Sequence, residues 1–183
     1  MATQQDRGTS VRLWPALLPL YGVALLVFVS DQLSKLWVLD ALGGREGAVL
    51  RVLGDVVWFR LVHNSGAAFG MLSDASLLFG LAAAAVAVGI LWYSRRLAVS
   101  PVLLRVALGF ELGGALGNLV DRLRFGYVVD FIDFRLNLRL WPWVFNVSDA
   151  SITIGVLLLM LYLLRAGGDS AATEPVRERR VDE

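Results

Sequence analysis

Four long apolar stretches dominate this chain, and they restrict it to folds that cross a lipid bilayer. They cover about residues 13–34, 75–93, 102–120 and 150–164. Each has roughly 15–22 residues, and a helix needs about 20 to cross about 30 Å of hydrocarbon. Apolar residues make up 57% of the 183 residues and the mean hydropathy is +0.64, both high for a soluble protein of this size. The sequence therefore predicts an α-helical membrane protein with four transmembrane helices.

The first apolar stretch is too long for a cleaved signal peptide, and three more follow it, so we expect it to stay as an anchor. Four spans put both termini on one side of the membrane. The short basic connector at 94–97 favours the cytoplasm for that side, although the longer loops also carry many arginines. We therefore expect a cytoplasmic tail over 1–12, a transmembrane domain over 13–165, and a disordered cytoplasmic tail over 166–183.

The two other connecting loops, at about 35–74 and 121–148, are long and contain strand-like segments. These segments are Val49–Leu53, Asp55–Val62 and Tyr127–Phe134. We expect them to form a small β-sheet at the extracytoplasmic membrane surface. Asp130 and Asp133 are interpreted as surface or sheet-edge residues, with support of a site as the alternative.

Residue counts exclude several kinds of chemistry. The chain has no cysteine, which rules out a thiol nucleophile, a disulfide framework and a thiolate metal site. His63 is its only histidine, so a site with several histidine ligands is also excluded. The net charge of +1 does not indicate a nucleic-acid partner.

Two aspartates near the ends of predicted spans are the main candidates for catalysis. Asp121 follows Asn118 by three residues, and Asp149 follows Asn146 by three. Ionisable groups are costly where water gives way to lipid, so they usually serve a site. A pair of them suggests acid–base chemistry on water. Helix capping by Asn146 or Asp149 remains the alternative at the second position.

Further polar and small residues could support such a site. Asp31 and Lys35 are four residues apart and can form a helical ion pair, with an interfacial salt bridge as the alternative. The segment Asn64–Gly70 is rich in small residues, which allow either a close approach to a partner or a tight surface turn. Gly113 and Gly117 have the four-residue spacing of close helix packing.

Taken together, these motifs closely resemble lipoprotein signal peptidase, the type II signal peptidase of bacteria. The matching stretches occur in the family's order, from about residue 14 to 165: DQLSK (31–35), NSGAAFG (64–70), GGALGNLVDRL (113–123), VVDF (128–131) and FNVSDASI (145–152). Two residues depart from the family's usual pattern. Ser148 stands where alanine is common, and Glu111 stands where an apolar residue is usual.

The resemblance implies an aspartyl endopeptidase of the bacterial inner membrane that needs no cofactor or metal. Its substrates would be diacylglyceryl-modified prolipoproteins, cleaved just before the lipidated cysteine, and we expect a monomer in contact with membrane lipid. By motif, Asp121 and Asp149 would be the catalytic pair. The positions expected to line or support the site are Asp31, Lys35, Asn64, Gly66, Asn118, Arg122 and Asn146. Glu111 has no assigned role; it could pair with Arg105 or carry a proton.

Two other classes of function are alternatives to the peptidase. Ser34 beside Lys35, or Ser65 near His63, could belong to a serine hydrolase, but neighbours on a helix project about 100° apart and suit a dyad poorly. Acids inside a membrane could also belong to a small transporter or channel. The predicted spans contain no broken helices, and their acids cluster towards one surface.

Overall fold

The computed structural model describes residues 13–66, 76–135 and 144–171. Its elements, in chain order, are α1 (Leu13–Ala41), β1 (Val49–Leu53), β2 (Val57–Asn64), α2 (Ser76–Tyr93), the short 3₁₀ helix η2 (Ser94–Val99), α3 (Val102–Phe125), β3 (Val128–Phe134), β4 (Val144–Phe145) and α4 (Val147–Ala171). Four helices are long and apolar enough to span a membrane, as the sequence predicts. The expected N-terminal tail, most of the expected C-terminal tail and most of the Asn64–Gly70 motif lie outside the described residues.

Three of the four long helices extend beyond the predicted apolar stretches. α1 continues to Ala41 and α3 to Phe125, while α4 begins at Val147. The added turns carry polar side chains that are buried inside the protein, so the apolar run marks only the part of each helix that can face lipid. α4 also continues past Arg165 to Ala171, into the segment predicted to be a disordered tail.

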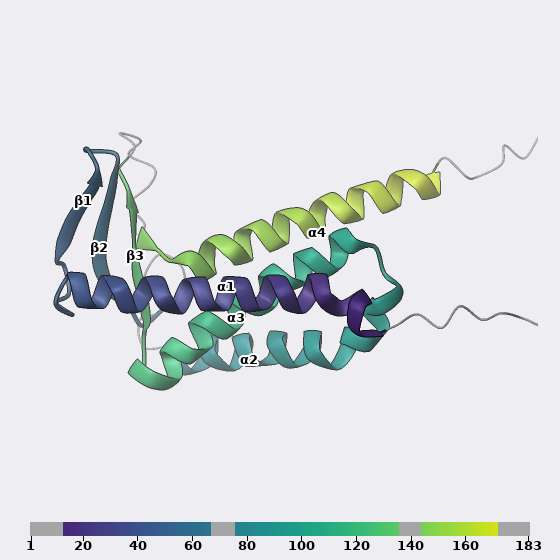
Figure 1. Ribbon diagram of the computed structural model, residues 1–183, viewed down its shortest axis with the longest axis horizontal. Coiled ribbons are helices and arrows are strands. Elements are labelled where there is room, and N and C mark those ends of the chain that lie inside the picture. Colours follow the sequence, from purple (N-terminus) through teal and green to yellow (C-terminus); the bar gives the residue numbers. More distant parts are fainter. Residues whose placement is uncertain (1–12, 67–75, 136–143, 172–183) are drawn as a thin grey trace, which may run out of the picture.

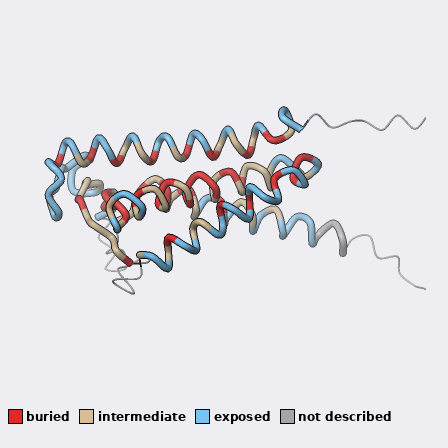
Figure 2. The backbone as a smooth tube through the Cα atoms, turned by 90° about the horizontal axis from the view of Figure 1, so that it is seen from below, coloured by how far each residue is buried: buried red, intermediate tan, exposed pale blue. Residues whose placement is uncertain are grey.

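Helix α3 is the centre of the bundle, because α1, α2 and α4 all pack against it. Figure 1 shows α3 lying behind α1, between α2 and α4. In Figure 2 the buried residues gather along α3 and along one side of α1. Large apolar residues such as Leu25, Leu81 and Leu157 are exposed on the outer helices, as expected for surfaces that face lipid.

A stripe of glycines on α3 allows α1 to approach closely. Gly109, Gly113 and Gly117 recur at every fourth position on the side of α3 that meets α1. A Cβ atom at Gly113 would lie only 2.7 Å from the carbonyl oxygen of Ala24. The predicted role of Gly113 and Gly117 in close helix packing is therefore confirmed.

The strands form one antiparallel sheet in the order β1-β2-β3-β4. Figure 1 places this sheet at the end of the bundle where α1 and α3 end and α4 begins. Phe59 of β2 packs edge-on against Trp37 of α1, with ring centroids 5.9 Å apart. Because β3 follows α3 and precedes α4 in the chain, its residues lie directly over these helix ends.

Candidate active site

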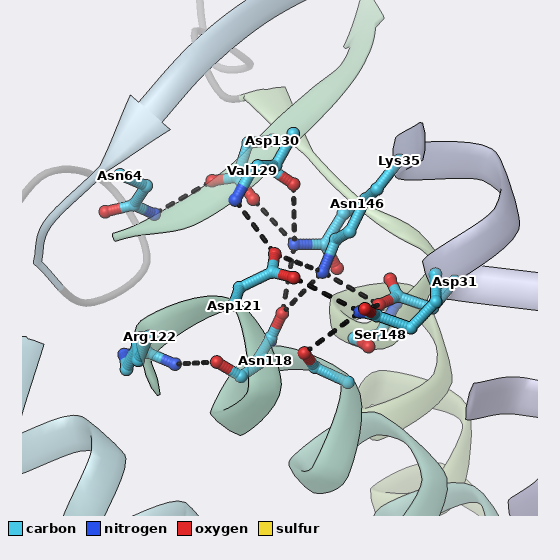
Figure 3. Close-up of polar contacts among 12 residues, drawn as sticks. Asp31, Lys35, Asn64, Asn118, Asp121, Arg122, Val129, Asp130, Asn146 and Ser148 are labelled. Carbon is cyan, nitrogen blue, oxygen red and sulfur yellow. Dashed lines mark hydrogen bonds and ion pairs between the residues drawn. The ribbon is translucent and has the colours of Figure 1, made fainter. Parts of the chain in front are cut away.

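A cluster of buried polar side chains lies where α1, α3, α4 and β3 meet (Figure 3). Polar groups removed from water in this way must satisfy one another. Every site residue predicted from the sequence contributes to this cluster or to its edge: Asp31, Lys35, Asn64, Gly66, Asn118, Asp121, Arg122, Asn146 and Asp149. The structure adds Gln32 and Asp130 to them.

Lys35 is the one cation within ion-pair distance of the cluster's carboxylates, among the residues described. Its Nζ lies 2.8 Å from Asp31 Oδ2 and 2.8 Å from Asp121 Oδ2. The predicted Asp31–Lys35 pair is therefore confirmed. Lys35 is 2% exposed, which contradicts the alternative of an interfacial salt bridge. These three residues, named the ion triad below, join α1 to α3.

Hydrogen bonds hold both carboxylates of the ion triad. The backbone N–H groups of Val129 and Ser148 donate to Asp121 Oδ2 at 3.0 Å and to Asp31 Oδ1 at 2.9 Å. The amide of Gln32 donates to Asp121 Oδ1 at 3.1 Å. Both carboxylates thus accept N–H donors in addition to facing Lys35, and hydrogen bonds to charged groups are stronger than those between neutral groups. The triad thus ties β3 and α4 to the helix pair.

Ser148 contacts Asp31 through its backbone N–H, and its hydroxyl is fully buried. The hydroxyl makes no hydrogen bond within the described residues. A Cβ atom at Gly117 would lie 2.1 Å from Ser148 Oγ and 2.6 Å from Asp31 Oδ2. Residue 117 must therefore be glycine for α1, α3 and α4 to meet here.

Asn146 and Asp149 form a reciprocal cap at the start of α4. The backbone N–H of Asp149 donates to Asn146 Oδ1 at 2.9 Å, and the backbone N–H of Asn146 donates to Asp149 Oδ2 at 3.4 Å. This is the pattern of a capping box. The capping interpretation from the sequence is correct, and it coexists with contacts that tie both residues to the polar cluster.

Two asparagine side chains connect α3, α4 and β3. Asn118 donates to Asp149 Oδ1 at 2.8 Å, while its own oxygen accepts from Lys35 Nζ and from the Asn146 amide, both at 3.2 Å. The Asn146 amide also donates to Asp130 Oδ1 at 2.6 Å. Asn118 therefore links Asp149 to the ion triad, and Asn146 links Asp149 to Asp130.

Asp130 is buried, which corrects its interpretation as a surface or sheet-edge residue. It is 1% exposed, and Asp133 is 5% exposed. The reason is that residues on both faces of β3 are buried or partly buried, so alternation along the strand does not separate buried from exposed positions. Asp133 pairs with Arg60 at 3.0 Å, away from the cluster, whereas Asp130 accepts the Asn64 amide at 2.9 Å inside it.

The charge environment of Asp130 differs sharply from that of Asp121. Burial, and then repulsion from Asp149, raises the pKa of Asp130 to about 7, against the opposing effect of its hydrogen bonds from Asn64 and Asn146. Among the described residues, no Lys or Arg lies within ion-pair distance of Asp130 or Asp149. The cluster thus divides into the ion triad and a pair of carboxyl groups without a cation, both bonded to Asn146.

Arg122 lies at the edge of the cluster, between α3, α2 and the loop after β2. It donates to the backbone oxygens of Asn118 at 3.3 Å and Gly66 at 3.4 Å. Its guanidinium carbon lies 5.9 Å from the ring centre of Phe79. Gly66 in turn donates its N–H to Asn64 Oδ1 at 3.0 Å. These contacts brace the backbone just after Asn64, the last residue of β2, whose amide donates to Asp130.

The contacts of the serines do not fit a serine hydrolase. Ser34 donates its hydroxyl to the carbonyl oxygen of Asp31 at 2.8 Å, and Lys35 is committed to the ion triad. His63 stacks on Tyr127 and approaches Glu46, and no hydrogen bond joins it to Ser65 in the described part of the chain. Over the same residues, no group of three or more His, Asp or Glu side chains is arranged to hold a metal ion.

Sequence reasoning favoured a surface or sheet-edge position for Asp130 and gave support of the site only as the alternative, which the structure bears out. A signal was present, because Asp130 lies within the VVDF stretch (128–131) that carries part of the family resemblance. Gln32 was overlooked, although it lies within DQLSK.

Comparison with known proteins finds relatives that match most of this chain. The family model described as signal peptidase (SPase) II matches residues 23–165. The lipoprotein signal peptidase of Moorella thermoacetica is 45% identical over 152 residues, covering 83% of this chain and 97% of that protein. The one from Caulobacter vibrioides is 44% identical over 146 residues, covering 77% and 83%.

A solved structure of a bacterial membrane enzyme has the same fold. It superposes with a TM-score of 0.72 at 29% sequence identity, covering 92% of this chain and 95% of that one. A second bacterial membrane enzyme gives a TM-score of 0.68 at 30% identity. With the family match over most of the chain and the four membrane-spanning helices, these likenesses lead to one conclusion: the chain belongs to the signal peptidase II family of membrane peptidases.

Proposed function

We propose that this chain is an aspartyl endopeptidase that removes the signal peptide from diacylglyceryl-modified prolipoproteins, cleaving just before the lipidated cysteine. Two relatives that cover most of the chain are named lipoprotein signal peptidase, which supports the substrate class. The observation that carries the aspartyl mechanism is the pair of carboxyl groups, Asp130 and Asp149, joined through Asn146 without a cation.

The contacts favour Asp130, rather than the expected Asp121, as the catalytic partner of Asp149. Two carboxyl groups can share one proton only if neither is neutralised by a cation. Asp121 shares the cation Lys35 with Asp31 and accepts a backbone N–H, so its carboxylate already has a charged partner. We therefore assign Asp121 to positioning Lys35 and β3, and the shared proton to Asp130 and Asp149.

The proposed reaction uses a water molecule held between these two carboxyl groups. The ionised carboxylate removes a proton from the water, which attacks the scissile carbonyl carbon. The protonated partner donates a hydrogen bond to the carbonyl oxygen and stabilises the tetrahedral intermediate. Neither residue is assigned the proton at rest, because an interacting pair titrates as a unit. Asn118 and Asn146 keep the two carboxyl groups oriented.

The lipid-facing surfaces of the helices fit a substrate that stays in the membrane. The cluster lies at one end of the bundle, where α4 begins and α3 ends. A diacylglyceryl chain could remain in the bilayer while the peptide bond reaches Asp149. We place the protein in the bacterial inner membrane, with both termini in the cytoplasm and the site near the extracytoplasmic face.

The test is cleavage by purified protein of matched prolipoproteins with and without the diacylglyceryl group. We expect only the lipidated form to be cleaved. Asp130→Asn and Asp149→Asn should abolish cleavage, whereas Asp121→Asn should lower it and leave a measurable rate. Asp133→Asn, on the same strand but paired with Arg60 outside the cluster, is the control and should retain cleavage.

The opposite outcomes would each remove one part of the proposal. Near-normal cleavage by Asp130→Asn, with none by Asp121→Asn, would restore the pair expected from the sequence. Equal cleavage of both prolipoproteins would remove the lipid requirement. The double variant Ser34→Ala and Ser65→Ala tests the alternative of a serine mechanism. The aspartyl mechanism predicts that this variant still cleaves the substrate, whereas a serine mechanism predicts a complete loss of cleavage.

A further inference from the structure

Glu111 is an acidic residue within a membrane-spanning helix that the proposed reaction does not use. It lies in α3, is partly buried, and makes no hydrogen bond or ion pair with any described residue. The pairing with Arg105 suggested by the sequence is not formed, because Arg105 donates to the carbonyl oxygen of Ala16. Polar groups at this depth are costly and are retained where they serve a function.

Glu111 lies on the same side of α3 as two residues of the site. At about 100° per residue, Glu111, Asn118 and Arg122 lie within roughly 40° of one another around the helix. Asn118 contacts Asp149 of α4, and Arg122 approaches Phe79 of α2. This side of α3, named the α3 stripe, therefore runs between α2 and α4.

At the level of Glu111, α4 covers only part of the α3 stripe, since Glu111 packs against Gly155 but keeps exposed surface. α2 and α4 each pack on α3 but hardly contact each other. Glu111 lies against α4 at Gly155, where an added Cβ atom would be 2.9 Å from Glu111 Oε1. Oε1 is enclosed there, while the side chain as a whole keeps exposed surface.

The α3 stripe leads from the catalytic carboxyl groups into the bilayer. Seven residues of helix separate Glu111 from Asn118, which corresponds to about 10 Å of depth. If the proposed function is correct, the hydrophobic helix of the signal peptide must descend from the cleaved bond into the membrane. A helix lying along the stripe would bring a residue about seven positions before the cleaved bond to Glu111.

We propose that Glu111 is a specificity-determining residue that recognises a serine or threonine hydroxyl in the membrane helix of the substrate. A carboxyl group accepts a hydrogen bond in either protonation state, and a hydroxyl donates one. An apolar substrate helix would leave the Glu111 oxygens without a partner, which is unfavourable away from water. This inference rests on the proposed function and names a preference within its substrate class.

The experiment uses lipidated prolipoprotein substrates with an all-leucine hydrophobic segment and one serine moved through successive positions. For each enzyme, kcat/KM for every serine substrate is divided by its value for the all-leucine substrate. For the unaltered protein we expect a preference of roughly threefold to tenfold at one depth, near the seventh residue before the cleaved bond. Glu111→Gln keeps an acceptor and should keep the preference, whereas Glu111→Leu should abolish it.

Each outcome decides between the alternatives. A ratio near one at every serine position in the unaltered protein would overturn the inference, as would a preference that survives in Glu111→Leu. Using the ratio within each enzyme removes any effect of the substitution on stability or on overall rate. If the unaltered protein cleaves none of the substrates, the proposed function fails instead, and the two failures are distinguishable.

Discussion

Asp130 accepts hydrogen bonds from the amides of Asn64 and Asn146, yet no described cation lies within ion-pair distance of it. The amides favour its ionised form, while burial and the nearby Asp149 favour the protonated form. The second influence is the stronger, since the pKa of Asp130 is raised to about 7. A carboxyl group whose pKa lies near neutral pH can both take up and release a proton during catalysis.

This balance predicts how cleavage depends on pH. Below about pH 7 the pair of Asp130 and Asp149 retains a shared proton, and above it the proton is lost, so kcat should fall as the pH rises through about 7. The hydrogen bond from Asn64 lowers the pKa of Asp130. Asn64→Leu should therefore raise that pKa and move the alkaline fall in kcat to higher pH. A profile of kcat against pH for both proteins measures the change.

The control for this prediction is Asp133→Asn, which removes a buried carboxylate of the same strand but lies outside the cluster. Its alkaline fall in kcat should match that of the unaltered protein. A shift of the Asn64→Leu profile to lower pH would contradict the assignment of Asp130 to the catalytic pair.

Single-residue features were predictable where the spacing within one helix decides them. The Asp31–Lys35 pair follows from four residues of separation, because such positions are neighbours on a helix. The third member of the ion triad was not predictable, since the contact of Lys35 with Asp121 depends on how α1 packs against α3. The role of Asp130 depends in the same way on which elements cover β3.

At the level of whole elements, the start of α4 combines a structural and a chemical role. Asn146 accepts the N–H of Asp149 through its side-chain oxygen, as a helix cap does. Its side-chain nitrogen donates to Asp130 and to Asn118. The oxygen thus stabilises α4 while the nitrogen orients the site, and substitutions can separate the two.

We expect Asn146→Ser and Asn146→Ala to have different stabilities and similarly reduced activities. Serine preserves the helix cap but has no amide donors. Alanine has neither, and loss of the cap lowers the free energy of unfolding by about 1 kcal/mol. Both variants should lose at least about tenfold in kcat, because two hydrogen bonds to the site disappear. Unfolding in a denaturing detergent and cleavage of a lipidated substrate give the two measurements. An Asn146→Ser variant with full cleavage would show that the cap alone matters.

The existence of the elements was largely predictable, and their ends were not. Long apolar runs identify the four helices, and β-branched and aromatic residues identify the three longer strands. However, α3 continues through Asp121 to Phe125, and α1 through Lys35 to Ala41. Charged residues end an apolar run in the sequence, but here they are paired inside the protein, so the helices do not stop at them.

At the scale of the whole molecule, the buried polar cluster lies at one end of the helix bundle. Figure 1 shows the sheet at this end, while the beginning of α1, the end of α4 and the α2–α3 connection lie at the opposite end. That connection is η2, which carries Arg95 and Arg96. Basic residues in short connections are retained in the cytoplasm. We therefore expect the site to face the outside of the cell.

Single-cysteine variants test this orientation without background, because the chain has no cysteine of its own. Asp55 lies in the exposed β1–β2 turn, and Arg95 is exposed in η2 at the other end of the bundle. In intact spheroplasts, a membrane-impermeant maleimide should label Asp55→Cys, and it should label Arg95→Cys only after the membrane is permeabilised. Cleavage of a lipidated substrate by both variants controls for correct folding. The reverse labelling pattern would place the proposed catalytic pair, Asp130 and Asp149, on the cytoplasmic side. A cleavage site that has already crossed the membrane could not reach the pair there.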